Sequence, residues 1–146
     1  MKKKIVTIYT DGGCVPNPGK GAWAAVLLYG KKRGEISGAE PDTTNNRMEL
    51  TAAIRALETL KEPCRVTLFT DSEYVKKGIT EWMPGWKRKN WARKGGALKN
   101  VDLWKTLDTL IQKHDVEWHW VRGHDGIREN ERCDELVARA ISSLRR

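Results

Sequence analysis

Apolar residues recur along the chain in two patterns, and each pattern predicts one type of secondary structure. Short runs in which apolar residues are continuous or alternate with polar ones are typical of β-strands. Such runs predict strands at residues 5–11, 21–29, 33–40, 66–71 and 116–121. The first three follow one another without an intervening helix, so we expect them to form an antiparallel meander.

A helical period, in which apolar residues recur every three or four positions, begins at about Thr44 and ends before Pro63. The apolar stripe of this helix consists of Met48, Ala52, Ala56 and Leu60. Further helices are predicted at residues 72–79, 99–114 and 129–144. A meander followed by alternating helices and strands predicts an α/β fold, with a mixed five-stranded sheet in which two strands run parallel and helices flank the sheet. We expect residues 1–146 to form one domain.

Two of the predicted strands end in an aspartate, Asp11 in the first and Asp71 in the fourth. The carboxyl ends of neighbouring parallel strands meet at one edge of a sheet, which is where open α/β sheets place their functional sites. Two carboxylates that lie so close together repel each other unless a positive group lies between them. A nearby lysine or arginine is one such group, but a divalent metal ion fits these hard oxygen ligands better.

Two further acids, Glu49 and Asp134, lie on the inward edges of predicted helices. Glu49 aligns with Ala53 on the apolar side of its helix, and Asp134 lies one turn before Val137. A carboxylate beside a buried face is costly unless it is paired or binds a cation. We therefore expect the four acids to converge on one site at the edge of the sheet.

Each of three acids also has a structural alternative. Asp71 can act as the N-cap of the helix that starts at Ser72. Glu49, three residues after Asn46, can belong to a capping box. Asp134 can be an ordinary first-turn acid that the helix dipole favours.

The chain carries 27 Lys and Arg against 19 Asp and Glu, which gives a net charge of +8 and a pI near 9.5. This excess indicates a polyanionic partner, with nucleic acid as the leading candidate and a merely soluble basic surface as the alternative. No apolar stretch approaches the ~20 residues of a membrane span, so we expect a cytoplasmic protein with no membrane partner. The three cysteines form no C-x-x-C pair and indicate neither a disulfide framework nor a zinc finger. Nothing in the sequence demands an oligomer, and we expect a monomer.

Aromatic and basic side chains are concentrated in residues 82–94. Pro84 and Gly85 interrupt this segment, which is therefore predicted to have neither helical nor strand regularity. Lysine and arginine can neutralise phosphates, and tryptophan faces can pack against sugar or base. We expect nucleic-acid contacts from Trp82, Trp86, Lys87, Arg88, Lys89 and Trp91. The alternative is a core helix with a solvated cationic face.

Four motifs follow one another at residues 10–19, 43–50, 70–72 and 123–134. The most specific parts are Asn46-Arg47-Met48-Glu49 and Asn130-Glu131-Arg132-Cys133-Asp134. With these motifs the chain resembles bacterial type 1 ribonuclease H over essentially its whole length. The resemblance implies the ribonuclease H-like fold and endonucleolytic cleavage of the RNA strand in RNA–DNA hybrids, which leaves 5′-phosphate and 3′-hydroxyl ends. It also implies roles in primer removal and R-loop resolution.

The resemblance further implies a two-metal site, with Mg²⁺ or Mn²⁺ held by the four acids already singled out, Asp11, Glu49, Asp71 and Asp134. His124 matches the family's mobile histidine, which relays protons or helps the product leave. The residues that match hybrid contacts are Cys14, Asn17, Thr44, Asn45 and Asn46. The basic segment 82–94 resembles the protrusion with which bacterial members hold the DNA strand.

Two acids depart from the family pattern. Glu73 stands where many bacterial relatives have glutamine, and Asp125 lies beside His124. Both departures concern the rate and the metal optimum and leave the reaction class unchanged. Two rival functions are a non-catalytic nucleic-acid-binding module and another nuclease or strand-transfer enzyme of the same fold. The intact set of acids argues against the first, and the asparagine-rich and tryptophan-rich segments argue against the second.

Overall fold

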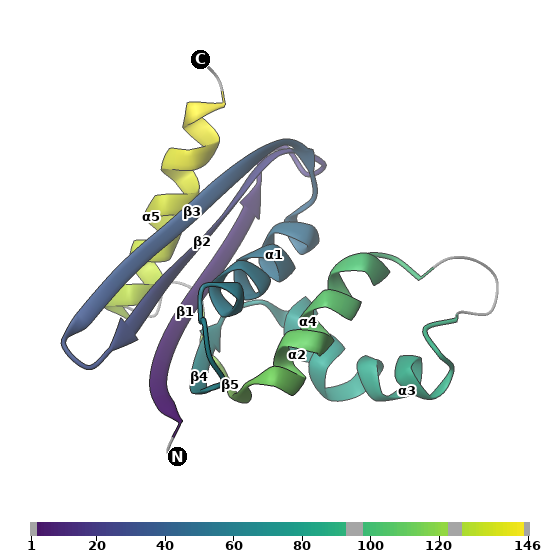
Figure 1. Cartoon of the computed structure of the whole chain (residues 1–146). Helices are drawn as coiled ribbons and strands as arrows, with labels where there is room; N and C mark the ends of the chain where they lie inside the picture. The colour runs from purple at the N-terminus through teal and green to yellow at the C-terminus, as the bar shows by residue number, and fades with distance from the viewer. Residues whose placement is uncertain (1–2, 93–97, 123–126, 145–146) are drawn as a thin grey trace.

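The computed structural model describes residues 3–92, 98–122 and 127–144, and Figure 1 shows how their helices and strands are arranged. A five-stranded sheet has the order β3-β2-β1-β4-β5. Its strands are β1 (Lys4–Cys14), β2 (Gly19–Tyr29), β3 (Lys32–Thr43), β4 (Cys64–Thr70) and β5 (Asp115–Trp120). The first three strands pair antiparallel, whereas β4 runs parallel to β1 and β5 runs parallel to β4. The predicted α/β fold, with its meander and its parallel strands, is confirmed.

Helices cover both faces of this sheet. They are α1 (Asn45–Glu58), α2 (Glu73–Lys77), α3 (Met83–Arg88), α4 (Val101–Lys113) and α5 (Arg128–Ser143). A π-helical turn, η1 (Gly78–Trp82), joins α2 to α3. Figure 1 shows α5 lying along the meander, while α2, α3 and α4 extend from the other side of the molecule beyond α1. Among the helices that the structure describes, none combines the length and the apolar character that crossing a membrane requires.

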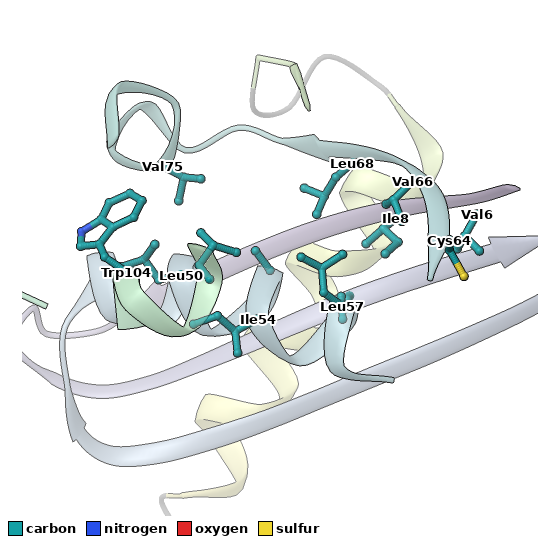
Figure 2. Packing of buried hydrophobic residues seen from close by; sticks show 14 of the residues in the cluster. Val6, Ile8, Leu50, Ile54, Leu57, Cys64, Val66, Leu68, Val75 and Trp104 are labelled. Atoms are coloured by element: carbon teal, nitrogen blue, oxygen red, sulfur yellow. The ribbon is translucent and has the colours of Figure 1, made fainter. Parts of the chain in front are cut away.

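The side chains of β2 alternate between the two faces, and this alternation assigns α1 and α5 to opposite sides. Ala25 belongs to the core that α1 covers, whereas its neighbours Ala24 and Val26 pack under α5. Figure 2 shows the α1 side, where apolar residues of β1, β4, α1 and α4 meet. Its fully buried members include Ile8, Leu50, Leu57, Leu68 and Trp104. The two cores hold β1 and β4 in place, and these strands carry two of the predicted site residues.

The basic segment 82–94 differs from its prediction, because its first part is helical. Residues 78–88 form η1 and α3 without a break, with Pro84 in the first turn of α3. Proline is tolerated there because its missing N–H group has no partner in the first turn of a helix in any case. The prediction of irregular structure was therefore wrong for residues 82–88.

Candidate active site

Asp11 and Asp71 lie side by side because of the parallel pairing of β1 and β4. This pairing runs from Lys4 with Cys64 to Tyr9 with Phe69, so Asp11 follows two residues after the last pair. Asp71 follows directly after β4 ends. β1 continues beyond Asp11 to Cys14, where it pairs with β2 and no longer with β4. The prediction that this strand ends at Asp11 was therefore wrong.

Glu49 reaches the two aspartates from α1. Suitably placed oxygens of Asp11, Glu49 and Asp71 all lie within 4.8 Å of one another. The approach of α1 to β1 depends on Gly12, because a Cβ atom there would collide with the backbone of Met48 and Glu49. The sheet edge and the second turn of α1 thus form one cluster of three carboxyl groups.

The helix caps decide against the structural alternatives for these acids. Thr44 is the N-cap of α1 and accepts a hydrogen bond from the Arg47 amide at 3.2 Å, so Glu49 does not form a capping box with Asn46. Ser72 rather than Asp71 caps α2, and its hydroxyl accepts from the Val75 amide at 3.1 Å.

Asp134 is the fourth predicted acid, and it lies in the second turn of α5 rather than in the first. Its side chain is exposed, and it is not among the three acids whose oxygens cluster within 4.8 Å. It is nevertheless close to Asp11, since the two side chains share a hydrogen bond. This hydrogen bond and the charge of Asp134 both raise the pKa of Asp11. Asp134 therefore stands at the open side of the cluster, next to Asp11.

Burial and mutual repulsion make the cluster costly to ionise. Asp11 is 8% exposed, and burial, followed by the charges of Asp71 and Asp134, raises its pKa to about 8. Glu49 is buried to a similar extent, and burial together with the charges of Asp11 and Asp71 raises its pKa well above the usual range. The Gly12 amide opposes both shifts through hydrogen bonds, without reversing them.

The donor set fits a hard divalent cation. Within the part of the chain that the structure describes, Oε1 of Glu49 is a buried oxygen without a hydrogen-bond partner. A buried carboxylate oxygen in this position is costly unless a cation or a donor satisfies it. The other ligands are also carboxylate oxygens, which suit Mg²⁺ or Mn²⁺ rather than softer metals.

The structure brings the predicted hybrid-contact residues together at the same edge of the sheet. The Asn45 amide donates to Oδ1 of Asn17 at 3.1 Å, which joins the loop after β1 to the start of α1. Asn17 and Asn46 are exposed, and Thr44 and Asn45 are half-buried. Cys14 is buried, and its Sγ lies 3.1 Å from the Pro16 carbonyl oxygen and 3.4 Å from that of Thr43. The Cys14 thiol thus holds the loop in place.

The tryptophans of the basic segment are half-buried and in mutual contact. The ring centroids of Trp82 and Trp86 are 5.9 Å apart, and those of Trp86 and Trp91 are 6.3 Å apart. Trp86 and Trp91 also pack against the α1-side core, so each has one face turned toward the protein. Lys87 pairs with Asp108 at 3.1 Å, while Arg88 and Lys89 are exposed.

A cavity of about 660 Å³ separates the start of α1 from α3. Its lining includes Asn46, Tyr74, Trp82, Trp86, Lys89 and Asn100. The sequence did not single out Tyr74 or Asn100. Asn100 has the left-handed backbone conformation that asparagine tolerates, and its Nδ2 donates to the Tyr74 hydroxyl at 3.0 Å. No periodic pattern connects these two residues, since they are 26 positions apart.

Two predicted features fall on residues outside the described part of the chain, namely His124 and the neighbouring Asp125. The two other histidines, His114 and His119, make contacts within the fold. Nδ1 of His114 accepts a hydrogen bond from the Cys64 amide at 3.0 Å, and His119 stacks on Phe69.

With this geometry established, comparison with known proteins identifies the family. The family model for RNase H matches residues 3–142. The chain belongs to the ribonuclease H family. A ribonuclease H of Hahella chejuensis is 60% identical over 135 residues, covering 92% of this chain and 91% of that protein. One of Cupriavidus necator is 56% identical over 142 residues, covering 97% of this chain and 98% of that protein.

Solved ribonuclease H structures have the same fold. LC9-RNase H1, described as a type 1 RNase H with the type 2 active-site motif, has a TM-score of 0.89 and 33% identity, and the match covers 98% of this chain and 74% of that one. LC11-RNase H1, solved with an RNA/DNA hybrid, has a TM-score of 0.75 and 24% identity over 97% of this chain and 99% of that one. The resemblance inferred from the motifs and the ribonuclease H-like fold that it implies are thus confirmed.

Proposed function

We propose that this chain hydrolyses the RNA strand of RNA–DNA hybrids and that divalent ions at Asp11, Glu49, Asp71 and Asp134 support the reaction. The observation that carries the proposal is the cluster of three carboxyl groups within 4.8 Å, with an unsatisfied buried oxygen on Glu49, in a chain of the ribonuclease H family. Such a cluster is unfavourable by itself and becomes favourable when cations neutralise it.

Two bound Mg²⁺ ions, or Mn²⁺ in their place, supply water activation and charge stabilisation in phosphodiester hydrolysis. Asp11 lies within β1 and Asp71 directly follows β4, the strand that pairs parallel with β1, and these positions hold both side chains most rigidly, so we propose that they would contribute to both ion sites. Glu49 and Asp134 then each complete the ligand shell of one ion.

The reaction adds water to the phosphorus atom and breaks its bond to the 3′ oxygen. The phosphate remains on the 5′ end of the released strand, and the leaving oxygen takes a proton and becomes a 3′-hydroxyl. We assign the movement of a proton, or assistance in product release, to His124. Glu49 contributes through burial, because it excludes water from the inner side of the cluster.

The hybrid is bound along the edge of the sheet and across α3. Asn17, Asn45 and Asn46 can donate and accept hydrogen bonds, which suits 2′-hydroxyl groups and minor-groove base edges. Thr44 lies beside Asn45 and Asn46, and we assign it to a DNA phosphate. Cys14 supports the loop that carries Asn17. The DNA strand lies on the half-buried tryptophans Trp82, Trp86 and Trp91, with Lys87, Arg88 and Lys89 at its phosphates.

We further propose that residues 1–146 act as one catalytic domain, as a monomer, in primer removal and R-loop resolution. The net charge of +8 supports binding to a polyanion.

One assay tests the proposal against its two rivals. Labelled RNA–DNA hybrid, duplex RNA and duplex DNA are incubated with Mg²⁺ and the wild-type chain, with Asp11→Asn as the inactive control. We expect cleavage of RNA in the hybrid alone, with 5′-phosphate ends. Hybrid binding without cleavage would support the non-catalytic module, and equal cleavage of duplex DNA would support another nuclease of this fold.

A further inference from the structure

Three consecutive residues of α5 point toward three adjacent strands of the sheet. The Arg132 guanidinium contacts Glu35 of β3, and Cys133 packs with Ala22, Ala24 and Val26 of β2. Asp134 lies close to Asp11 of β1. Successive helix residues are rotated by about 100°, so Arg132 and Asp134 extend to opposite sides of the helix when Cys133 faces the sheet.

The middle residue holds the helix down on the sheet. Cys133 is fully buried, and its Sγ lies 3.3 Å from the Tyr9 carbonyl oxygen, two residues before Asp11. The Cys133 thiol donates a hydrogen bond to that carbonyl oxygen. Together with Val137 and Ile141, which are buried on the same face of the helix, this contact sets the height and the general orientation of α5 above β1 and β2.

An ion-pair network between α5 and β3 adds a further constraint on the rotation of α5. Arg132 contacts Glu35 through two nitrogens, at 2.8 and 3.0 Å, and Arg33 contacts Glu129 through two nitrogens, at 3.0 and 2.8 Å. Arg33 also pairs with Glu35 at 2.7 Å, which joins the two bidentate pairs into one network. Glu129 and Arg132 are three residues apart and therefore lie on the same side of α5.

The network is stronger than scattered surface ion pairs. Its two-nitrogen contacts fix the orientation of each guanidinium plane as well as its position. The side chains of Glu129, Glu35 and Arg132 are 15%, 25% and 28% exposed, so solvent screens them only in part. Hydrogen bonds from Arg132 and Arg33 lower the pKa of Glu35 to about 2, so its charge persists across the whole neutral and mildly acidic range.

We infer that the Arg132–Glu35 and Arg33–Glu129 pairs are positioning contacts for metal binding, because they set the rotation of α5 that brings the Asp134 carboxylate to Asp11. The inference rests on the proposed role of Asp134 as a metal ligand. Loss of the β3 contacts lets the start of α5 turn slightly over its buried face of Cys133, Val137 and Ile141, and this movement displaces Asp134 from its place next to Asp11. Arg132 touches neither substrate nor metal and acts through the helix alone.

The test compares metal binding with stability in matched variants of the full chain. Glu35→Gln and Arg132→Met each remove one partner of the central pair, and Arg132→Lys keeps the charge but not the two-nitrogen contact. Glu62→Gln is the control, because Glu62 forms a similarly short ion pair with Lys4, at 2.8 Å, near the starts of the paired strands β1 and β4, whereas the cluster lies toward their other ends. Mn²⁺ affinity is measured by isothermal titration calorimetry, and the Mg²⁺ concentration for half-maximal cleavage and the KM for the hybrid are measured in parallel.

We expect Glu35→Gln and Arg132→Met to weaken Mn²⁺ binding and to raise the Mg²⁺ requirement by about tenfold, since outer contacts that orient metal ligands have effects of this size. Arg132→Lys is expected to lie between them and the wild type. For these variants, the KM for the hybrid at saturating Mg²⁺ is expected to stay within about twofold of the wild-type value. For Glu62→Gln, the Mn²⁺ affinity, the Mg²⁺ requirement and the KM are all expected to stay within the same twofold range, which is an energy difference below 0.5 kcal/mol.

Adding Glu35→Gln to Asp134→Ala separates this inference from the proposed function. If the network acts through Asp134, the double variant binds Mn²⁺ no more weakly than Asp134→Ala alone. The inference is overturned if the effects of the two substitutions add, or if Glu35→Gln lowers the unfolding temperature without changing metal affinity. The proposed role of Asp134 itself fails if Asp134→Ala binds Mn²⁺ as tightly as the wild type.

Discussion

The Arg47 guanidinium pairs with the Asp102 carboxylate at 2.9 Å and joins the first turn of α1 to the first turn of α4 across 55 positions of the chain. The same guanidinium donates to Oδ1 of Asn100 at 3.2 Å. Asn100 in turn donates to the Tyr74 hydroxyl, which also accepts a bond from the indole of the buried Trp104 at 3.1 Å. The residues proposed to contact the hybrid at the start of α1 are therefore tied to those on α3 through α4.

Replacement of Arg47 by methionine is expected to loosen this connection while leaving the carboxylate cluster intact. A partly exposed bidentate pair of this kind contributes about 1 kcal/mol, which corresponds to roughly a fivefold change in a binding constant. We expect Arg47→Met to raise the KM for the hybrid by about that factor, with kcat close to the wild-type value. Steady-state cleavage kinetics measure both constants.

Arg65→Met is the matched control for this substitution. Arg65 pairs with Asp115 at a longer distance of 3.9 Å, and both side chains are largely exposed. Its KM is expected to equal that of the wild type. A lower kcat with an unchanged KM in Arg47→Met contradicts the prediction, because it places the effect at the chemical step.

The raised pKa of Asp11 predicts a pH-dependent stability in the absence of divalent ions. In the unfolded chain this carboxyl group ionises near pH 3.9, but in the folded protein it ionises only at about pH 8. The unfolded state therefore holds fewer protons between these values, and the free energy of unfolding falls as the pH rises from about 4 to about 8. Asp11→Asn is expected to reduce this fall, to stabilise the metal-free protein at pH 8 by at least about 1 kcal/mol and to abolish cleavage.

Urea unfolding at pH 5 and pH 8, in EDTA and in Mg²⁺, checks this prediction. Asp42→Asn serves as the control, since Asp42 is exposed on β3, and it is expected to keep the wild-type pH dependence. Mg²⁺ is expected to stabilise the wild type more at pH 8 than at pH 5. Equal loss of stability with pH in Asp11→Asn and in the wild type argues against the raised pKa.

Gly12 provides a steric test of the contact between β1 and α1. A Cβ atom at this position collides with the backbone of Met48 and Glu49, so Gly12→Ala must push the second turn of α1 away from the sheet. Overpacking of this kind costs about 1–3 kcal/mol and here also displaces Glu49 from the cluster. We expect a loss of stability together with weaker Mn²⁺ binding, measured by urea unfolding and calorimetry.

Gly34→Ala is the matched control, because a Cβ atom there meets nothing within 4 Å among the described residues. It is expected to change neither stability nor metal affinity. If Gly12→Ala were as neutral as Gly34→Ala, the close approach of α1 to β1 would be refuted.

The buried His114 predicts a second, opposite pH effect. Burial lowers the pKa of His114, and its Nδ1 accepts the Cys64 amide, so the folded protein favours the neutral ring. The stability that this contact provides is present above the unfolded-state pKa of about 6.5 and is lost as the pH falls below it. His114→Ala leaves the Cys64 amide without its acceptor, and we expect a cost of about 1–3 kcal/mol at pH 8.

Unfolding by urea at pH 8 and pH 5.5 measures this effect. The difference in unfolding free energy between wild type and His114→Ala is expected to be smaller at pH 5.5. At that pH the folded wild type must either protonate His114 or keep it neutral at a cost in free energy relative to the unfolded chain, and protonation removes the contact with the Cys64 amide. His119→Ala is the control, since His119 is exposed, stacks on Phe69 and lies 3.5 Å from the Glu117 carboxylate. A constant difference at both pH values contradicts the prediction.

The sequence by itself determined the elements and the position of two acids on them. The period of the apolar residues predicted the strands of the meander, the parallel pair and the long helices, because that period is a local property of the chain. It placed Asp71 at the C-terminal end of its strand, and the structure puts Asp71 directly after the last strand residue, Thr70. Asp11 lies inside β1 rather than at its end, since its pairing with β2 continues where the pairing with β4 stops. Pro84 and Gly85 concealed α3, because composition alone does not show that Pro84 occupies a first turn.

Only the tertiary structure decided which charged groups meet. Arg47 pairs with Asp102, and Arg132 pairs with Glu35 at a separation of 97 positions. Neither pair can be predicted from the local pattern of apolar and polar residues. The unsatisfied oxygen of Glu49 depends on how closely α1 approaches Gly12, which is set by packing between distant segments. The local period of apolar residues determines which segments become helices and which become strands. Which distant residue a side chain reaches depends on the rotation and spacing of the packed elements, and these are fixed only when the whole core assembles.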